Sequence, residues 1–197
     1  MSPHSKVGAV ILAAGASLRF GRPKQFVQFR GKSLVRRAFD AANEAGCCPI
    51  VVVTGRDHED VAAQLPQDSP LVIRNENWSR GIGSSVRAGV EALISQSPVR
   101  GILLLVCDQP FVEAEIIRQL IVVRQTSRKP VVACRYSNTL GVPALFDAVC
   151  LGELLALGGE SGAKSIIMRD PTRVAEVEFD QGAIDIDTPS QYQEIAS

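Results

Sequence analysis

Residues 10–25, VILAAGASLRFGRPKQ, place a glycine turn and three cationic side chains directly behind an apolar run. Gly15 can adopt backbone conformations that a side chain forbids, and the small residues around it let backbone N–H groups approach a ligand closely. Arg19, Arg22 and Lys24 bring positive charge to the same loop. Backbone donors combined with cations make a phosphate-binding site. An ordinary strand-to-helix turn with solvated cations is the alternative.

The P-loop motif does not account for this segment. That motif requires four residues between its glycines and a lysine after the second. Here five residues separate Gly15 from Gly21, and Arg22 follows. The later segment GKS, residues 31–33, has Phe26 where the motif requires its first glycine. The phosphate site predicted at Gly15 is therefore of another kind.

Two acidic residues stand where a complex of metal and phosphate could bind. Asp108 of VCDQP ends the most apolar run of the chain, and in an open α/β sheet ligands bind beyond the carboxyl ends of the strands. Mg²⁺ bridging this carboxylate to phosphate oxygens is one role, and an Asx turn stabilised by Pro110 is the alternative. Asp187 of DIDTP is a candidate second metal ligand, or an acidic residue favoured beside a helix N-terminus.

The segment SRGIGSSVRAG, residues 79–89, offers uncharged donors. Its glycines and paired serines open a predicted helix, where N–H and hydroxyl groups could bind a base or a ribose. Capping of that helix by Ser84 or Ser85 explains the same residues equally well.

Short apolar runs predict the scaffold that positions these groups. They are continuously apolar, which is typical of strands covered on both faces of a parallel sheet. Longer segments with helical spacing lie between them, so right-handed crossovers and a doubly wound sheet follow. The predicted strands are residues 7–13, 49–55, 71–75, 101–108 and 130–136, and the predicted helices are 33–45, 58–65, 83–95 and 113–124.

The alternation loosens after about residue 135. Here the sequence predicts a short strand at 141–146, helices at 147–157 and 161–169, a strand at 173–179 and a last helix at 188–196, which Thr188 and Gln191 would cap. We expect one domain, residues 1–197, in an α/β fold of three layers with a mostly parallel sheet. Residues 7–135 would form the regular part of this domain, and residues 136–197 the less regular part.

Composition excludes several classes of function. The net charge is zero and the pI is about 6.7, so neither a nucleic-acid surface nor a membrane surface is expected. The five cysteines include no C-x-x-C pair, and only two histidines are present, which disfavours structural zinc. No run is long enough to span a membrane and no signal peptide is evident. The sequence predicts buried thiols in a cytoplasmic protein.

The segment LAAGASLRFGRPKQ resembles the opening signature of sugar-nucleotide-type nucleotidyltransferases. GIGSSVRAG, CDQP, GVPALF and DIDTPSQY follow in the order seen in molybdenum cofactor cytidylyltransferases and related MobA-like enzymes, so the resemblance runs from about residue 7 to residue 193. It implies a Rossmann-like nucleotide-diphospho-sugar transferase fold, in which residues 7–135 would bind nucleotide and residues 136–197 would form the acceptor side. It also implies transfer of a nucleoside monophosphate from a triphosphate to a phosphorylated acceptor, with release of pyrophosphate.

The resemblance also implies roles for individual residues. Arg19, Lys24 and Asp108 would be catalytic, the two cations holding the triphosphate. Asp108 and Asp187 would coordinate Mg²⁺. The nucleotide would be bound by Leu12, Ala13, Ala14, Gly15, Arg19, Lys24, Gly81 and Ser85, and the acceptor by Gly141, Pro143 and Lys164.

Ala14 favours CTP, because L-A-A-G accompanies cytidine nucleotides in this family and L-A-G-G accompanies guanylyl transfer. The implied acceptor is molybdopterin, with a molybdoenzyme as recipient. Two departures bear on that acceptor: GESGAK, with Glu160 and Lys164, replaces the family's G-D-x-G-A-R, and Val142 replaces a histidine. Transfer to a sugar or polyol phosphate, guanylyl transfer, and a non-catalytic nucleotide-binding or cofactor-delivery protein stay open as alternatives.

Overall fold

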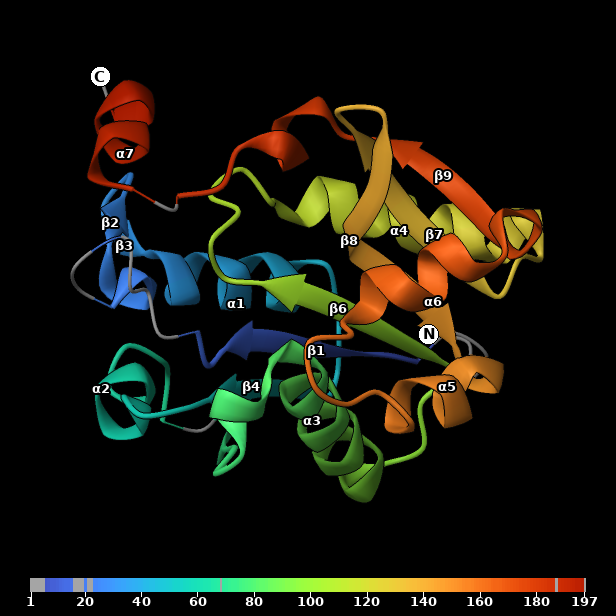
Figure 1. Cartoon of the computed structure of the whole chain (residues 1–197), viewed down its shortest axis with the longest axis horizontal. Coiled ribbons are helices and arrows are strands. Elements are labelled where there is room, and N and C mark those ends of the chain that lie inside the picture. Colours follow the sequence, from blue (N-terminus) through green and yellow to red (C-terminus); the bar gives the residue numbers. More distant parts are fainter. Residues whose placement is uncertain (1–5, 16–19, 21–22, 68, 187, 197) are drawn as a thin grey trace.

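The computed structural model describes residues 6–15, 20, 23–67, 69–186 and 188–196 (Figure 1). Strands alternate with helices along most of the chain, as the sequence predicts. The strands are β1 (Val7–Ala13), β2 (Gln28–Phe29), β3 (Lys32–Ser33), β4 (Ile50–Thr54), β5 (Leu71–Arg74), β6 (Gly101–Val106), β7 (Val131–Tyr136), β8 (Thr139–Asp147) and β9 (Val174–Glu178). The α-helices are α1 (Leu34–Glu44), α2 (His58–Ala62), α3 (Ile82–Gln96), α4 (Ala114–Ser127), α5 (Leu151–Leu155), α6 (Ala163–Arg169) and α7 (Pro189–Ala196).

Seven strands form one sheet in the order β5-β4-β1-β6-β8-β7-β9. Neighbouring strands are parallel except at β8, which runs antiparallel to both β6 and β7. The predicted α/β class with a mostly parallel sheet is therefore confirmed. The strand expected at 141–146 is longer than predicted and runs antiparallel to both neighbours, because Ser137 and Asn138, with φ of 46° and 58°, turn the chain directly back onto β7.

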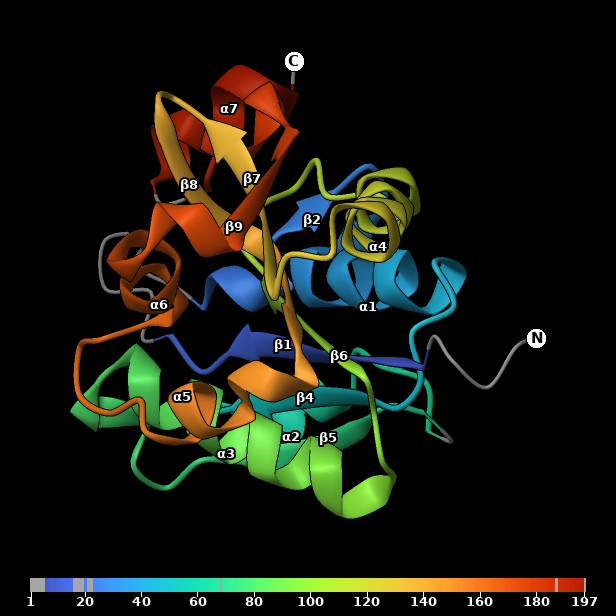
Figure 2. The same cartoon turned by 90° about the vertical axis from the view of Figure 1, so that its right-hand side faces the viewer.

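Both faces of the sheet are covered, which explains the continuously apolar strands. In β1, Ala9 and Ile11 face a core with α1 and α4, while Val10 and Leu12 face a second core with α3, α5 and α6. Figure 2 shows these two helical layers on opposite sides of the sheet. In the described part of the chain, no helix is both long and apolar enough to cross a bilayer.

Some local elements differ from the prediction. The strand expected to end at Asp108 ends at Val106, so the carboxylate lies in the turn beyond it. Strands β2 and β3 form a small hairpin that the sequence did not predict, with Arg30 and Gly31 at positive φ in its turn. Two-residue strands give no periodic signal, so only the turn could have indicated them.

The C-terminal segment closes the sheet edge where the strands β1 and β6 end. Ile186 is fully buried in a third cluster with Phe20 and Phe29, and its N–H donates to the carbonyl of Asp108 at 3.0 Å. Thr188 N–H donates to Gln191 Oε1 at 2.9 Å, which is part of the predicted capping box. This segment thus ties helix α7 to the turn that carries Asp108.

The cysteines differ sharply in exposure. Cys47, Cys107, Cys134 and Cys150 are buried, whereas Cys48 is exposed. Burial raises the pKa of Cys47, Cys107 and Cys134 to about 12. Because the thiolate is the nucleophile, we expect iodoacetamide at pH 8 to modify Cys48 alone in the folded protein and all five cysteines after denaturation, as counted by mass spectrometry. Rapid labelling of Cys107 in the folded protein would contradict this burial.

Candidate active site

A cavity of ≈ 410 Å³ lies beyond the carboxyl ends of β1 and β6. The start of α3 and the loop between α5 and α6 complete its wall. Seven of the residues predicted to bind nucleotide or metal border it: Leu12, Ala14, Gly15, Lys24, Gly81, Ser85 and Asp108. Ala13 lies buried in β1 just behind them. The fold therefore gathers segments that are far apart in sequence into one hollow at the position expected for a ligand in an open α/β sheet.

Lys24 and Asp108 form an ion pair in this cavity. Lys24 Nζ donates to Asp108 Oδ2, and the two side chains are only 15% and 21% exposed. They lie 84 residues apart in sequence and meet because β1 and β6 are neighbours in the sheet. A cation and a carboxylate that share a partly buried site are suited to binding phosphate groups together with a divalent cation.

Gln25 holds the turn after β1, and sequence reasoning missed this role. Its side chain is 2% exposed, and Nε2 donates to the carbonyls of Ala13 and Gly15 at 2.8 and 2.9 Å. The amide thus fixes the backbone that the small residues were predicted to expose. A glutamine directly after Lys24 was visible in the sequence, but only its burial reveals what it binds.

The start of α3 is built on buried hydrogen bonds. Asn75 Nδ2 lies 2.9 Å from Ser84 Oγ and 3.0 Å from Ser85 Oγ, and Ser84 Oγ also lies 2.8 Å from the carbonyl of Gly81. Ser84 is therefore a structural residue, while Ser85 borders the cavity. The suggested capping of this helix by Ser84 or Ser85 is wrong, because Gly81 occupies the N-cap position.

The loop of residues 158–161 docks onto the same helix. Gly83 N–H donates to the carbonyl of Gly159 at 3.0 Å. A Cβ at Gly81 would lie 2.4 Å from that carbonyl oxygen, so only glycine permits this approach. The docked loop brings Glu160 to the rim of the cavity. The two segments are about 75 residues apart, so local sequence patterns could not predict this contact.

Two apolar residues complete the wall. Trp78 lies against Gly55, where a Cβ would be 2.9 Å from the indole ring, and Ile82 at the start of α3 is 42% exposed. Both border the cavity, and the sequence analysis named neither. A half-buried aromatic ring and an exposed isoleucine form a surface suited to a flat apolar group.

Cys107 also borders the cavity but is not a nucleophile. Burial raises its pKa to about 12, so the thiol stays protonated at neutral pH.

The three predicted acceptor residues do not border this cavity. Gly141 lies in β8 and packs against the side chain of Tyr136 in β7. Pro143 is buried in β8, and Lys164 is exposed on α6. Arg19 and Asp187 lie outside the described residues, so the structure does not place them. The structure therefore brings together most of the residues predicted for the nucleotide, whereas the three predicted for the acceptor lie elsewhere.

Gln109 of the DQP motif links the two halves of the chain. Its side chain is 7% exposed, and Nε2 donates to the carbonyl of Val142 at 3.1 Å and to that of Gly182 at 2.8 Å. Sequence reasoning assigned it no role. It ties the turn that carries Asp108 to β8, so the acceptor side is positioned relative to the carboxylate.

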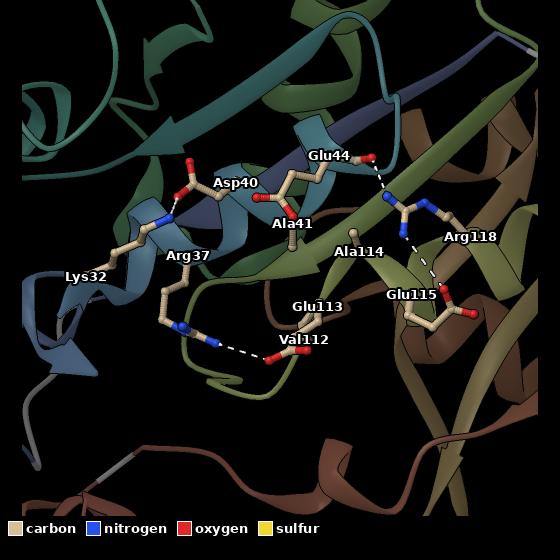
Figure 3. A pocket seen from close by; sticks show the side chains of 10 residues that line it. All are labelled: Lys32, Arg37, Asp40, Ala41, Glu44, Val112, Glu113, Ala114, Glu115 and Arg118. Carbon is tan, nitrogen blue, oxygen red and sulfur yellow. Dashed lines mark hydrogen bonds and ion pairs between the residues drawn. The ribbon is translucent and has the colours of Figure 1, made fainter. Parts of the chain in front are cut away.

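A second cavity, of ≈ 300 Å³, lies between α1 and the start of α4 (Figure 3). Most of its charges are paired with one another: Lys32 Nζ lies 2.6 Å from Asp40 Oδ2, and Arg37 lies 3.7 Å from Glu113. It has no counterpart to the glycine turn after β1. We therefore place the chemistry at the larger cavity.

The larger cavity suits a metal ion that binds together with a phosphate ligand. Among the described residues, no group of three or more His, Cys, Asp or Glu side chains could hold a metal ion by itself. Mg²⁺ is commonly bound through one or two carboxylates, with substrate phosphates and water as the other ligands. Asp108 provides such a carboxylate beside Lys24, so the donor set suits Mg²⁺ delivered with a nucleotide.

Comparison with known proteins decides the family. Residues 9–174 match the MobA-like NTP transferase domain. The chain belongs to this family. MobA-like domains are nucleotidyltransferases, and the cavity with its glycine turn, lysine and aspartate is the part of this chain suited to that reaction.

The chain is also similar to proteins of several kinds. The chain is 29% identical over 196 residues to nicotine blue oxidoreductase of Paenarthrobacter nicotinovorans, covering 94% of both proteins. It is 34% identical over 121 residues to the bifunctional enzyme IspD/IspF of Novosphingobium aromaticivorans, covering 60% of this chain and 31% of that relative. The crystal structure of Rv0371c from Mycobacterium tuberculosis superposes with a TM-score of 0.82 at 29% identity over 99% of both chains. Rv0371c has also been crystallised with manganese, at a TM-score of 0.77, 26% identity and 98% coverage of both chains.

Proposed function

We propose that this protein transfers CMP from CTP to a phosphorylated small molecule and releases pyrophosphate. The observation that carries the proposal is the Lys24–Asp108 pair beside the Gln25-held glycine turn, in a cavity large enough for a nucleotide. The turn supplies backbone donors, the lysine supplies positive charge, and the aspartate supplies a carboxylate for Mg²⁺.

The chain's own residues would act by binding and by electrostatics. A phosphate monoester is already a nucleophile at neutral pH, so no general base is required for its attack on the α-phosphorus. The protein must instead hold two anions in line and offset their repulsion. Lys24 would exchange its carboxylate partner for phosphate oxygens and stabilise charge that develops toward pyrophosphate. Arg19, predicted in the same loop, would add a second cation.

Asp108, with Asp187 as a second candidate ligand, would hold the metal. Bound Mg²⁺ neutralises phosphate charge and polarises the phosphorus. The manganese complex of Rv0371c supports a divalent cation in a relative of the same fold and similar length.

Molybdopterin is the acceptor that we propose first, with a molybdoenzyme as recipient of the product. The order of the CDQP, GVPALF and DIDTPSQY motifs supports it. A polyol phosphate is the second candidate, because the IspD/IspF relative is 34% identical over 121 residues. One observation argues against this second candidate. The cytidylyltransferases that act on methylerythritol phosphate, a polyol phosphate, carry an H-D-A-A-R segment, and this chain lacks it.

Trp78 gives a direct test of nucleotide binding, because it is the only tryptophan in the sequence and it borders the cavity. We expect CTP with Mg²⁺ to change its fluorescence, with weaker responses to GTP, ATP and UTP. A Trp78→Phe variant should lose the signal but keep binding by calorimetry. If no nucleotide binds by either method, the proposal is wrong.

Pyrophosphate release then separates enzyme from binding protein. With CTP, Mg²⁺ and the two candidate acceptors supplied in turn, we expect release with one acceptor only. Tight CTP binding without release from any phosphorylated acceptor would favour the non-catalytic alternative.

A further inference from the structure

The active-site cavity has two chemically different ends, and the strand order sets them apart. Trp78 lies against Gly55, which follows β4, whereas Asp108 follows β6. Strand β1 lies between these two strands in the sheet. Because neighbouring strands are spaced about 4.8 Å apart, the two ends of the cavity are separated by about 10 Å.

A nucleotide matches this division. Its triphosphate suits the end with Lys24 and Asp108, and its flat base suits the end with Trp78 and Ile82. The separation of about two strand spacings is comparable to the span from the phosphates to the edge of a base. The base end is therefore the end at which the nucleotide is distinguished from other nucleotides.

Glu160 is the charged side chain that borders the base end. Its loop is held on the start of α3 by the bond between Gly83 N–H and the carbonyl of Gly159, and its own backbone nitrogen would lie 2.8 Å from a Cβ at Gly81. Within the residues that the structure describes, the Glu160 carboxylate makes no hydrogen bond or ion pair. An exposed carboxylate on an anchored loop, without such a partner, is free to bind a donor on a ligand.

We propose that Glu160 recognises the edge of the base and selects cytosine over uracil. An ionised carboxylate only accepts hydrogen bonds. Cytosine presents an exocyclic amine as a donor, whereas uracil presents a carbonyl oxygen that a carboxylate repels. This inference rests on the proposed nucleotidyl transfer and names the side chain that would discriminate between its substrates.

The test compares the affinities for CTP and UTP in wild type and in Glu160→Gln. The amide can donate as well as accept, so we expect CTP to bind more weakly and UTP more tightly. The ratio of the two dissociation constants should move by about tenfold toward UTP, which is the size expected for a hydrogen bond to a charged group. Trp78 fluorescence and calorimetry with Mg²⁺ measure both constants.

Two further variants sharpen the result. Glu160→Asp keeps the carboxylate on a shorter arm and should retain the preference for CTP. Glu91→Gln removes an exposed carboxylate farther along α3 and should leave the ratio unchanged. Circular dichroism of each variant verifies that the fold is intact.

Failure of this inference differs from failure of the proposed function. If wild type binds CTP but Glu160→Gln keeps the wild-type ratio, Glu160 does not recognise the base and the inference is overturned. The inference is also overturned if the affinities for CTP and UTP fall by the same factor, or if only the KM for the acceptor changes. If wild type binds no nucleotide, the proposed function itself is wrong.

Discussion

Lys24→Ala and Asp108→Asn are each expected to lower turnover by about 10²-fold or more while the protein stays folded. The two groups form one partly buried ion pair, and both face the cavity where the phosphates would bind. Donors and charges that are preorganised around a developing charge contribute roughly this much to catalysis. Pyrophosphate release under saturating CTP and acceptor measures the effect.

The two variants should differ in nucleotide binding. Asp108→Asn removes a negative charge beside Lys24, so CTP binding without Mg²⁺ should be retained or strengthened although turnover is lost. Lys24→Ala removes the cation itself, so binding should weaken with and without Mg²⁺. This opposite response separates the role of the cation from that of the carboxylate.

A second lysine–aspartate pair provides the matched control. Lys32 Nζ lies 2.6 Å from Asp40 in the smaller cavity of Figure 3, and Lys32 is 52% exposed. Exposed pairs contribute about 0–1 kcal/mol to stability, so Lys32→Ala should change turnover little. Near-normal turnover in Lys24→Ala or Asp108→Asn would refute the assignment of the active site.

Gly81→Ala is expected to damage both the fold and the binding of nucleotide. Gly81 has φ 108° and ψ 169°, a region that is essentially restricted to glycine. A Cβ there would also lie 2.4 Å from the carbonyl oxygen of Gly159, so the loop of residues 158–161 would have to move away from α3. Backbone strain of this kind costs about 1–3 kcal/mol, before the displaced loop is counted.

The expected result is measurable in two ways. For a chain of this size, about 2 kcal/mol corresponds to a fall of about 4–8 °C in Tm. Nucleotide affinity should fall by about tenfold or more, because the wall that carries Glu160 is displaced. The control is Gly152→Ala in α5, where a Cβ meets nothing within 4 Å and alanine should be neutral or slightly stabilising. An unchanged Tm in Gly81→Ala would show that the loop is not anchored there.

Local patterns in the sequence were sufficient to predict most of the strands and helices. The strands β1, β4 and β6 are apolar without interruption, and the structure buries both of their faces. The meeting of Gly15 and Asp108 at one cavity could also be predicted, because this glycine turn and this aspartate each follow a predicted strand, and parallel strands end at the same edge of a sheet.

Other features depend on contacts between distant segments. The direction of β8, the burial of Gln25 and the docking of residues 158–161 onto α3 arise from neighbours that are far apart in the chain. Hydrophobic periodicity describes one element at a time, so it contains no information about which element lies opposite. For that reason the sequence did not identify Trp78 as part of the larger cavity, although it is the only tryptophan in the chain.

The sequence by itself therefore determined the α/β class, the order of most elements and several of the residues that border the larger cavity, because these depend on patterns within single elements and on the polarity of parallel strands. Only the tertiary structure decided that Lys24 meets Asp108, that Ser84 is structural, and that Glu160 reaches the cavity. Each of these depends on which surfaces pack together, and packing is a property of the folded chain as a whole.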